Sequence, residues 1–182
     1  KKIYDYWFFI PILILASYFI FRLINQSQMM WIFPTDAFAN DFAGHIAKLQ
    51  MLGKHGLFSL APEWYNGQYI ILKAYPPGWY LFALPFLALF NDPSIAGYFS
   101  LLAMYVFGFL FILLIGKFAN LSLTKRIAFF FFFFANPLAI GYFMRLGKMP
   151  EMLAWVFVLL LFALMVAYFK KNKLDLKFIL LF

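Results

Sequence analysis

Asp41, His45 and Lys48 stand at helical spacing in the stretch NDFAGHIAKLQ, within an otherwise apolar chain. A carboxylate held between water and lipid is suited to act as a general base or metal ligand, because partial desolvation raises its pKa. His45 follows Asp41 by one helical turn, so the carboxylate could orient the imidazole, or both could contact one ligand. Capping of a helix start by Asp36, Asn40 or Asp41 is the competing explanation. Three such side chains exceed what one cap requires, and we assign Asp41 as a candidate catalytic residue.

Glu151 is the second candidate acid. It follows Pro150, which suits the first position of a helix, so stabilisation by the helix dipole also explains an acid there. An acidic residue that opens an apolar helix beside a polar loop is nevertheless a candidate for function. Arg145 and Lys148 flank Glu151 and could hold a phosphate, although anchoring of the helix end accounts for them nearly as well.

Other polar and aromatic side chains could bind a ligand, each with a simpler alternative. His45 is expected at the surface of an amphipathic helix, and Lys48 and Lys54 could extend to lipid headgroups. An aromatic and polar group offers stacking faces and hydrogen bonds of the kind used to bind sugars, or else forms an interfacial aromatic belt. Its members are Glu63, Trp64, Tyr65, Asn66, Tyr69 and Tyr75.

The composition predicts an integral membrane protein. Hydrophobic residues make up 66% of the 182 residues, and the mean hydropathy is +0.86. The net charge of +8 comes from Lys and Arg at the ends of apolar segments instead of one patch, so we expect no nucleic acid partner. The chain has no cysteine, which excludes disulfides and thiolate metal sites.

The apolar runs predict an all-α fold, a polytopic transmembrane helical bundle within a single domain over 1–182. None of the runs suggests a broken helix, so a transporter is the weakest alternative. Because the chain lacks an initial Met and stops inside an apolar run, we expect a fragment of a longer protein, with its first run a retained anchor. The expected membrane segments are 3–25, 94–118, 126–143 and 150–169, with a fifth from 174.

One short segment decides the topology: residues 76–90 are apolar, begin with two prolines and contain Pro85. If this segment crossed the membrane, with the N-terminus cytoplasmic, most later basic residues would lie outside, against the usual preference. We therefore predict that it does not cross. The inner side then carries Lys1, Lys2, Lys117, Lys125, Arg126, Lys170, Lys171 and Lys173, and the outer side Lys48, Lys54, Lys73, Arg145 and Lys148.

The consequence is a long outer loop over 26–93 that opens on the same face as the short loop 145–151. Within the long loop we predict interfacial helices over 36–54 and 77–90. The first is amphipathic, with Phe42, Ile46 and Leu49 on one stripe, and should end at Gly53 or Gly56.

The runs NDFAGHIAKLQML, YPPGWY and RLGKMPEML, in this order around one long outer loop, resemble the N-terminal part of the GT-C superfamily. These are polytopic glycosyltransferases that use sugars linked to polyprenyl phosphate or diphosphate. The resemblance implies that Asp41 is the catalytic base or a metal contact, and that Glu151 is the acid of the second outer loop. A divalent cation, Mg or Mn, would then bind at Asp41 and Glu151. The Asp-x-Asp or Asp-Glu pair of the family is absent, because Asn40 precedes Asp41.

The function implied is transfer of a hexose or pentose from the lipid-linked donor to an acceptor on the outer face. Asp41 would take the proton of the acceptor, while Arg145, Lys148 or Lys73 would offset charge on the departing phosphate, and His45, Glu63, Trp64 and Tyr75 would bind substrate. The expected location is the plasma membrane of a bacterium or archaeon, with the bilayer and the donor as partners. The alternative is a non-catalytic subunit that keeps the same scaffold and packs with other membrane proteins.

Overall fold

The structure, a computed structural model, describes residue 7 and residues 9–31, 40–56, 60–62, 68–69 and 77–171. The described secondary structure consists of helices and two short antiparallel strands, joined by turns. The helices are α2 (Phe9–Gln26), η1 (Ser27–Met30), α3 (Asn40–His55), α4 (Gly78–Phe90), α5 (Pro93–Phe118), α6 (Leu123–Phe133), α7 (Pro137–Ile140), the π-helix η2 (Gly141–Arg145) and α8 (Met149–Lys171), and the strands are β1 (Leu60–Ala61) and β2 (Gln68–Tyr69).

Three helical stretches are long and apolar enough to cross a membrane: Phe9–Met30, Pro93–Phe118 and Met149–Phe169. The bent pair formed by α6 and the α7–η2 segment brings the number to as many as four. The protein is therefore a multi-pass membrane protein by the length and hydropathy of its helices. The strand pair is the one departure from an all-helical chain among the described residues.

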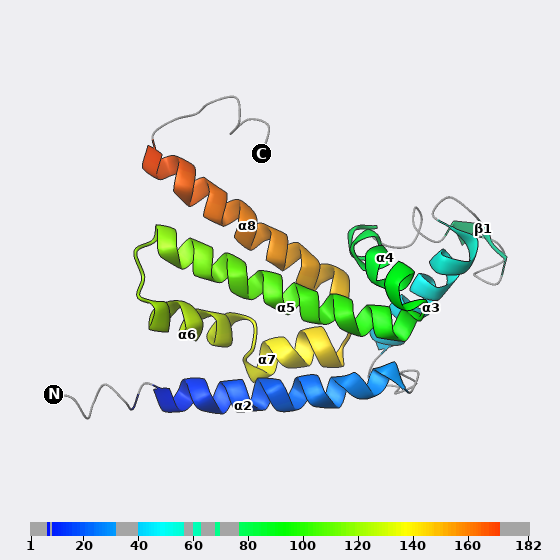
Figure 1. Cartoon of the computed structure of the whole chain (residues 1–182), viewed down its shortest axis with the longest axis horizontal. Helices are drawn as coiled ribbons and strands as arrows, with labels where there is room; N and C mark the ends of the chain where they lie inside the picture. The colour runs from blue at the N-terminus through cyan, green and yellow to red at the C-terminus, as the bar shows by residue number, and fades with distance from the viewer. Residues whose placement is uncertain are drawn as a thin grey trace.

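Helix α5 is the centre of the bundle, in contact with α8, α4 and α6. Figure 1 shows α3, α4 and the start of α8 gathered at the end of the bundle where α5 begins. Helix α4 has 13 residues, about 20 Å in length, and joins α5 through a two-residue turn at Asn91 and Asp92. Asp92 caps α5, because its Oδ1 accepts hydrogen bonds from the amides of Ser94 and Ile95 at 2.8 Å. In this arrangement α3, α4 and the loop before α8 share one end of the bundle.

The segment predicted over 126–143 is not one continuous helix. Helix α6 ends at Phe133, the chain turns through Asn136, and the next helix starts at Pro137 with a bend of 46°. The expectation of an unbroken helix is wrong because proline lacks an amide donor and holds the residue before it in extended conformation. The π-helix that follows contacts α8, where Tyr142 reaches Glu151 in the first turn.

Helix α3 buries its apolar stripe in the bundle. Phe42, Ile46 and Leu49 are at most 1% exposed. Gly97 of α5 allows this close packing, since a Cβ there would lie 2.3 Å from Cδ1 of Ile46. The helix ends at His55, and Gly56 follows with a φ of 84°, so the second of the two expected terminating glycines ends it.

Candidate functional site

An ion pair joins the two polar segments that the sequence singles out. Lys148 Nζ donates a hydrogen bond to Oδ2 of Asp41, which links the loop before α8 to the first turn of α3. The Lys148 side chain is 27% exposed and that of Asp41 is 35% exposed. The pair is therefore partly exposed, at one end of an apolar bundle.

Gly147 allows the loop to reach Asp41. Its φ is +67°, in the left-handed region, and a Cβ at this position would lie 2.5 Å from the backbone nitrogen of Phe42. No other residue fits here without displacing the first turn of α3. The backbone of the loop thus lies directly on the backbone of α3, one residue from each partner of the ion pair.

His45 is buried, although the sequence predicts it at the surface. It is 3% exposed, its Nδ1 lies 2.7 Å from the phenolic oxygen of Tyr80, and its ring lies 5.6 Å from the ring of Trp79. The prediction is wrong because α4 packs over this side of α3. Lys48, one turn further along, is also buried, at 9% exposed.

Burial also sets the charge of these side chains. It lowers the pKa of His45 to about 4, and the positive charge of Lys48 adds to the effect, while Asp41 opposes it. His45 is therefore a neutral imidazole at pH 7. Burial likewise lowers the pKa of Lys48, and Asp41 opposes that shift as well.

Glu151 lies in the first turn of α8, as predicted, and is partly buried. Tyr142 of the π-helix donates a hydrogen bond from its hydroxyl to Oε2 of Glu151. Tyr142 and the exposed Arg145 also line a cavity of about 340 Å³ beside the π-helix. Glu151 thus follows Lys148 by three residues, at the same end of the bundle as Asp41.

Tyr80 and Tyr142 are site residues that the sequence analysis missed. In the sequence, Tyr80 is one tyrosine in a short apolar segment, and Tyr142 stands nine residues before Glu151. Neither position belongs to a distinctive pattern. Four predicted residues, Glu63, Trp64, Lys73 and Tyr75, lie outside the described residues.

The sequence analysis predicts a divalent cation at Asp41 and Glu151, and few possible ligands lie together among the described residues. The described residues contain no group of three or more His, Cys, Asp or Glu side chains that could hold a metal ion. One oxygen of Asp41 already accepts from an ammonium group, and one oxygen of Glu151 from a phenol. The divalent cation at Asp41 and Glu151 stays a prediction.

The chain matches no protein-family model, no curated protein and no solved structure. The site combines a partly exposed carboxylate, Asp41, and an ammonium group, Lys148, with a second acid and an exposed guanidinium nearby in sequence. Such a set can accept a proton and stabilise an anion at the surface of a membrane.

Proposed function

We propose that this protein is a membrane glycosyltransferase of the GT-C type, which transfers a hexose or pentose from a polyprenyl phosphate or diphosphate donor. The observation that carries the proposal is the ion pair between Asp41 and Lys148. It combines a candidate base with a candidate phosphate ligand at the water-accessible end of a membrane bundle. The N-terminus would face the cytoplasm of a bacterium or archaeon, and the site would open on the outer face.

The position of the site suits a substrate that is partly lipid and partly sugar phosphate. The hydrocarbon tail of such a donor lies in the bilayer, so its phosphate is confined to the membrane surface. A bundle end that carries Lys148 and Arg145 can receive the phosphate from the side, while the acceptor enters from water. Arg145 suits this role because a planar guanidinium binds phosphate through two hydrogen bonds.

In the proposed reaction, the bond between the anomeric carbon and the donor phosphate oxygen breaks, and its electron pair stays with the phosphate. The acceptor oxygen forms a new bond to the opposite face of the same carbon, so the configuration inverts. The Asp41 carboxylate takes the proton of the acceptor, and Lys148 and Arg145 offset the charge on the leaving phosphate.

The ion pair also suggests how the base is released. In the resting site, Lys148 donates to Asp41. An arriving donor phosphate would compete for the same ammonium group, because its anionic oxygens accept hydrogen bonds from an ammonium as a carboxylate does. As Lys148 turns to the phosphate, an oxygen of Asp41 becomes available to the acceptor hydroxyl. Binding of the donor would thus precede activation of the acceptor.

His45 has a positioning role in this scheme. It is neutral and buried, so it cannot supply positive charge to the phosphate. Its short contact with Tyr80 instead connects α3 to α4 one turn after Asp41. Loss of this contact would allow the first turn of α3 to shift relative to the loop that carries Lys148.

The test is a transfer assay with protein in lipid nanodiscs, polyprenyl-linked sugar donors and a mixture of acceptors. Asp41→Asn should reduce the rate by about 10²- to 10⁴-fold, the range for loss of a general base. Asp92→Asn is the matched control, since it makes the same change at the same end of the bundle and asparagine caps a helix as well as aspartate.

Undiminished transfer by Asp41→Asn would remove Asp41 from the mechanism. The competing function, a non-catalytic subunit with this scaffold, would be supported if no donor gave transfer and the protein co-purified in a stoichiometric complex with other membrane proteins.

A further inference from the structure

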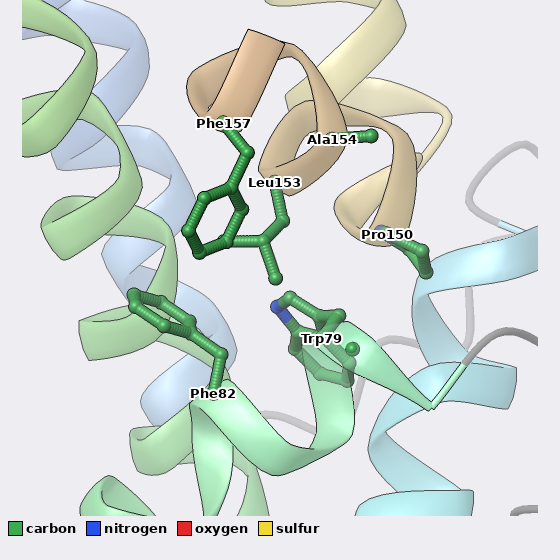
Figure 2. Close-up of a pocket in the computed structure, with 7 residues that line it drawn as sticks. Trp79, Phe82, Pro150, Leu153, Ala154 and Phe157 are labelled. Carbon is green, nitrogen blue, oxygen red and sulfur yellow. The ribbon is translucent and has the colours of Figure 1, made fainter. Parts of the chain in front are cut away.

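A second cavity lies between α4 and the first turns of α8, and its volume is about 440 Å³. Figure 2 shows Trp79 and Phe82 on one side of it, with Leu153 and Phe157 facing them from α8. A cavity of this volume is in the range that holds small molecules or parts of larger ones. The lining residues are Gly78, Trp79, Phe82, Pro150, Leu153, Ala154 and Phe157.

The indole nitrogen of Trp79 is the one polar side-chain group in this lining. Trp79 is 1% exposed, and its Nε1 has no hydrogen-bond partner among the described residues. In Figure 2 this nitrogen lies on the edge of the ring that is turned toward Leu153 and Phe82. A buried N–H group without an acceptor costs free energy, so an acceptor that enters the cavity would be bound at this point.

The depth of the cavity indicates what kind of molecule carries that acceptor. Helix α8 begins at Met149, and Phe157 follows eight residues later, about 12 Å along the helix axis. The polar region of a bilayer is roughly 5 to 7 Å thick on each side of the hydrocarbon core. A bilayer whose surface lies at the first turn of α8 would place Pro150 in the polar region and Phe157 in the hydrocarbon, so the cavity would reach both.

We propose that this cavity binds one phospholipid of the surrounding bilayer. One acyl chain occupies the apolar space between Phe82 and Phe157, and the ester carbonyl at the head of that chain accepts a hydrogen bond from Nε1 of Trp79. Ester carbonyls lie at the boundary between the polar region and the hydrocarbon, and the same placement of the bilayer brings the indole N–H to that boundary. This proposal does not depend on the glycosyltransferase function.

The bound lipid would also support the polar site. The Trp79 ring also lies close to His45, at 5.6 Å between ring centroids. An acyl chain in the cavity would hold the indole in place beside His45. The lipid would thus stabilise the contact between α3 and α4 without taking part in any reaction.

The experiment measures lipid retention by native mass spectrometry of the detergent-purified protein, after addition of one equivalent of lipid. The two probes are a phosphatidylcholine with ester-linked palmitoyl chains and its dialkyl ether analogue, which lacks the carbonyl oxygens. Wild-type protein should retain one ester lipid. Trp79→Phe, which keeps an aromatic ring and removes the N–H, should weaken retention of the ester lipid about 3- to 10-fold and leave that of the ether lipid unchanged.

A second pair of variants tests the cavity itself. Ala154→Phe places a ring in the cavity and should abolish retention of both lipids. Val158→Phe is the control on the same helix, because Val158 is 48% exposed and does not line the cavity.

Three results would overturn the proposal: no lipid on the wild-type protein, equal effects of Ala154→Phe and Val158→Phe, or an equal effect of Trp79→Phe on both lipids. Displacement of the phospholipid by equimolar polyprenyl phosphate would also overturn it, since the cavity would then belong to the donor.

Discussion

Gly147 and Phe42 lie with their backbones in direct contact, and a Cβ on Gly147 would lie 2.5 Å from the backbone nitrogen of Phe42. Each is next in sequence to a partner of the ion pair between Lys148 and Asp41. The geometry of the candidate site therefore depends on the absence of a side chain at one position.

Gly147→Ala should disrupt this contact. Alanine at a φ of +67° costs about 1–2 kcal/mol, and its methyl group would push the loop from α3. We expect a lower Tm in detergent and loss of transfer activity. The control is Gly141→Ala in the preceding π-helix, where a Cβ would meet no atom within 4 Å. Equal Tm values for the two variants would contradict the packing argument.

Exchange of the two charges separates the structural role of the ion pair from its chemical role. Because both side chains are partly exposed, Asp41→Asn or Lys148→Met should lower the free energy of unfolding by only about 0.2–1 kcal/mol. The double variant Asp41→Lys with Lys148→Asp should restore stability, since the opposite charges remain paired. It should not restore transfer, because the carboxylate no longer extends from α3. Recovery of activity in the exchanged protein would show that Asp41 acts only through the pair.

The low pKa of His45 should make the folded protein less stable in mild acid. Its pKa is about 4 in the folded protein, against 6.5 for an ordinary histidine, so between these values the unfolded chain binds a proton that the folded chain does not. Stability therefore rises with pH in this window and falls by roughly 1.4 kcal/mol per unit as the pH drops through it. Unfolding measured from pH 7 to pH 4 should show this slope in the wild type and a smaller one in His45→Gln. The same slope in both would mean that His45 is not the group responsible.

Asn136 should stabilise the bend between α6 and α7. Its Nδ2 donates to the carbonyl of Phe132 at 2.7 Å, and its Oδ1 accepts from the amides of Leu138 and Ala139 at 2.9 Å. Asn136→Ala removes both functions and should lower stability by about 1–2 kcal/mol. Asn136→Asp keeps the acceptor but not the donor, so its Tm should be intermediate. If Asn136→Ala had the same Tm as the wild type, other groups would have to form the hydrogen bonds of the backbone at the bend.

The helix ends with strong local signals were predictable from sequence. Helix α5 starts at Pro93, one residue before the predicted start, because Asp92 and Pro93 form an N-cap and first position that are independent of the rest of the fold. The end of α3 at His55 follows in the same way from Gly56. The bend at Asn136 also had a local signal in Pro137, but the length of the apolar run concealed it.

The burial of the site could not be predicted, since it depends on contacts between distant segments. The sequence places Asp41, His45 and Lys48 on one stripe of a helix, and that stripe alone predicts exposure to water or headgroups. Only the position of α4 places Tyr80 against His45. Likewise, the spacing of Lys148 and Glu151 gave no indication that the lysine would pair with Asp41, 107 residues away.

The bend at Asn136 has a consequence for the polar groups of the backbone. An interrupted helix leaves carbonyl and amide groups without their usual partners in the helical ladder. Here one carboxamide satisfies the carbonyl of Phe132 before the interruption and the amides of Leu138 and Ala139 after it. The polypeptide therefore changes direction without leaving these three groups unpaired.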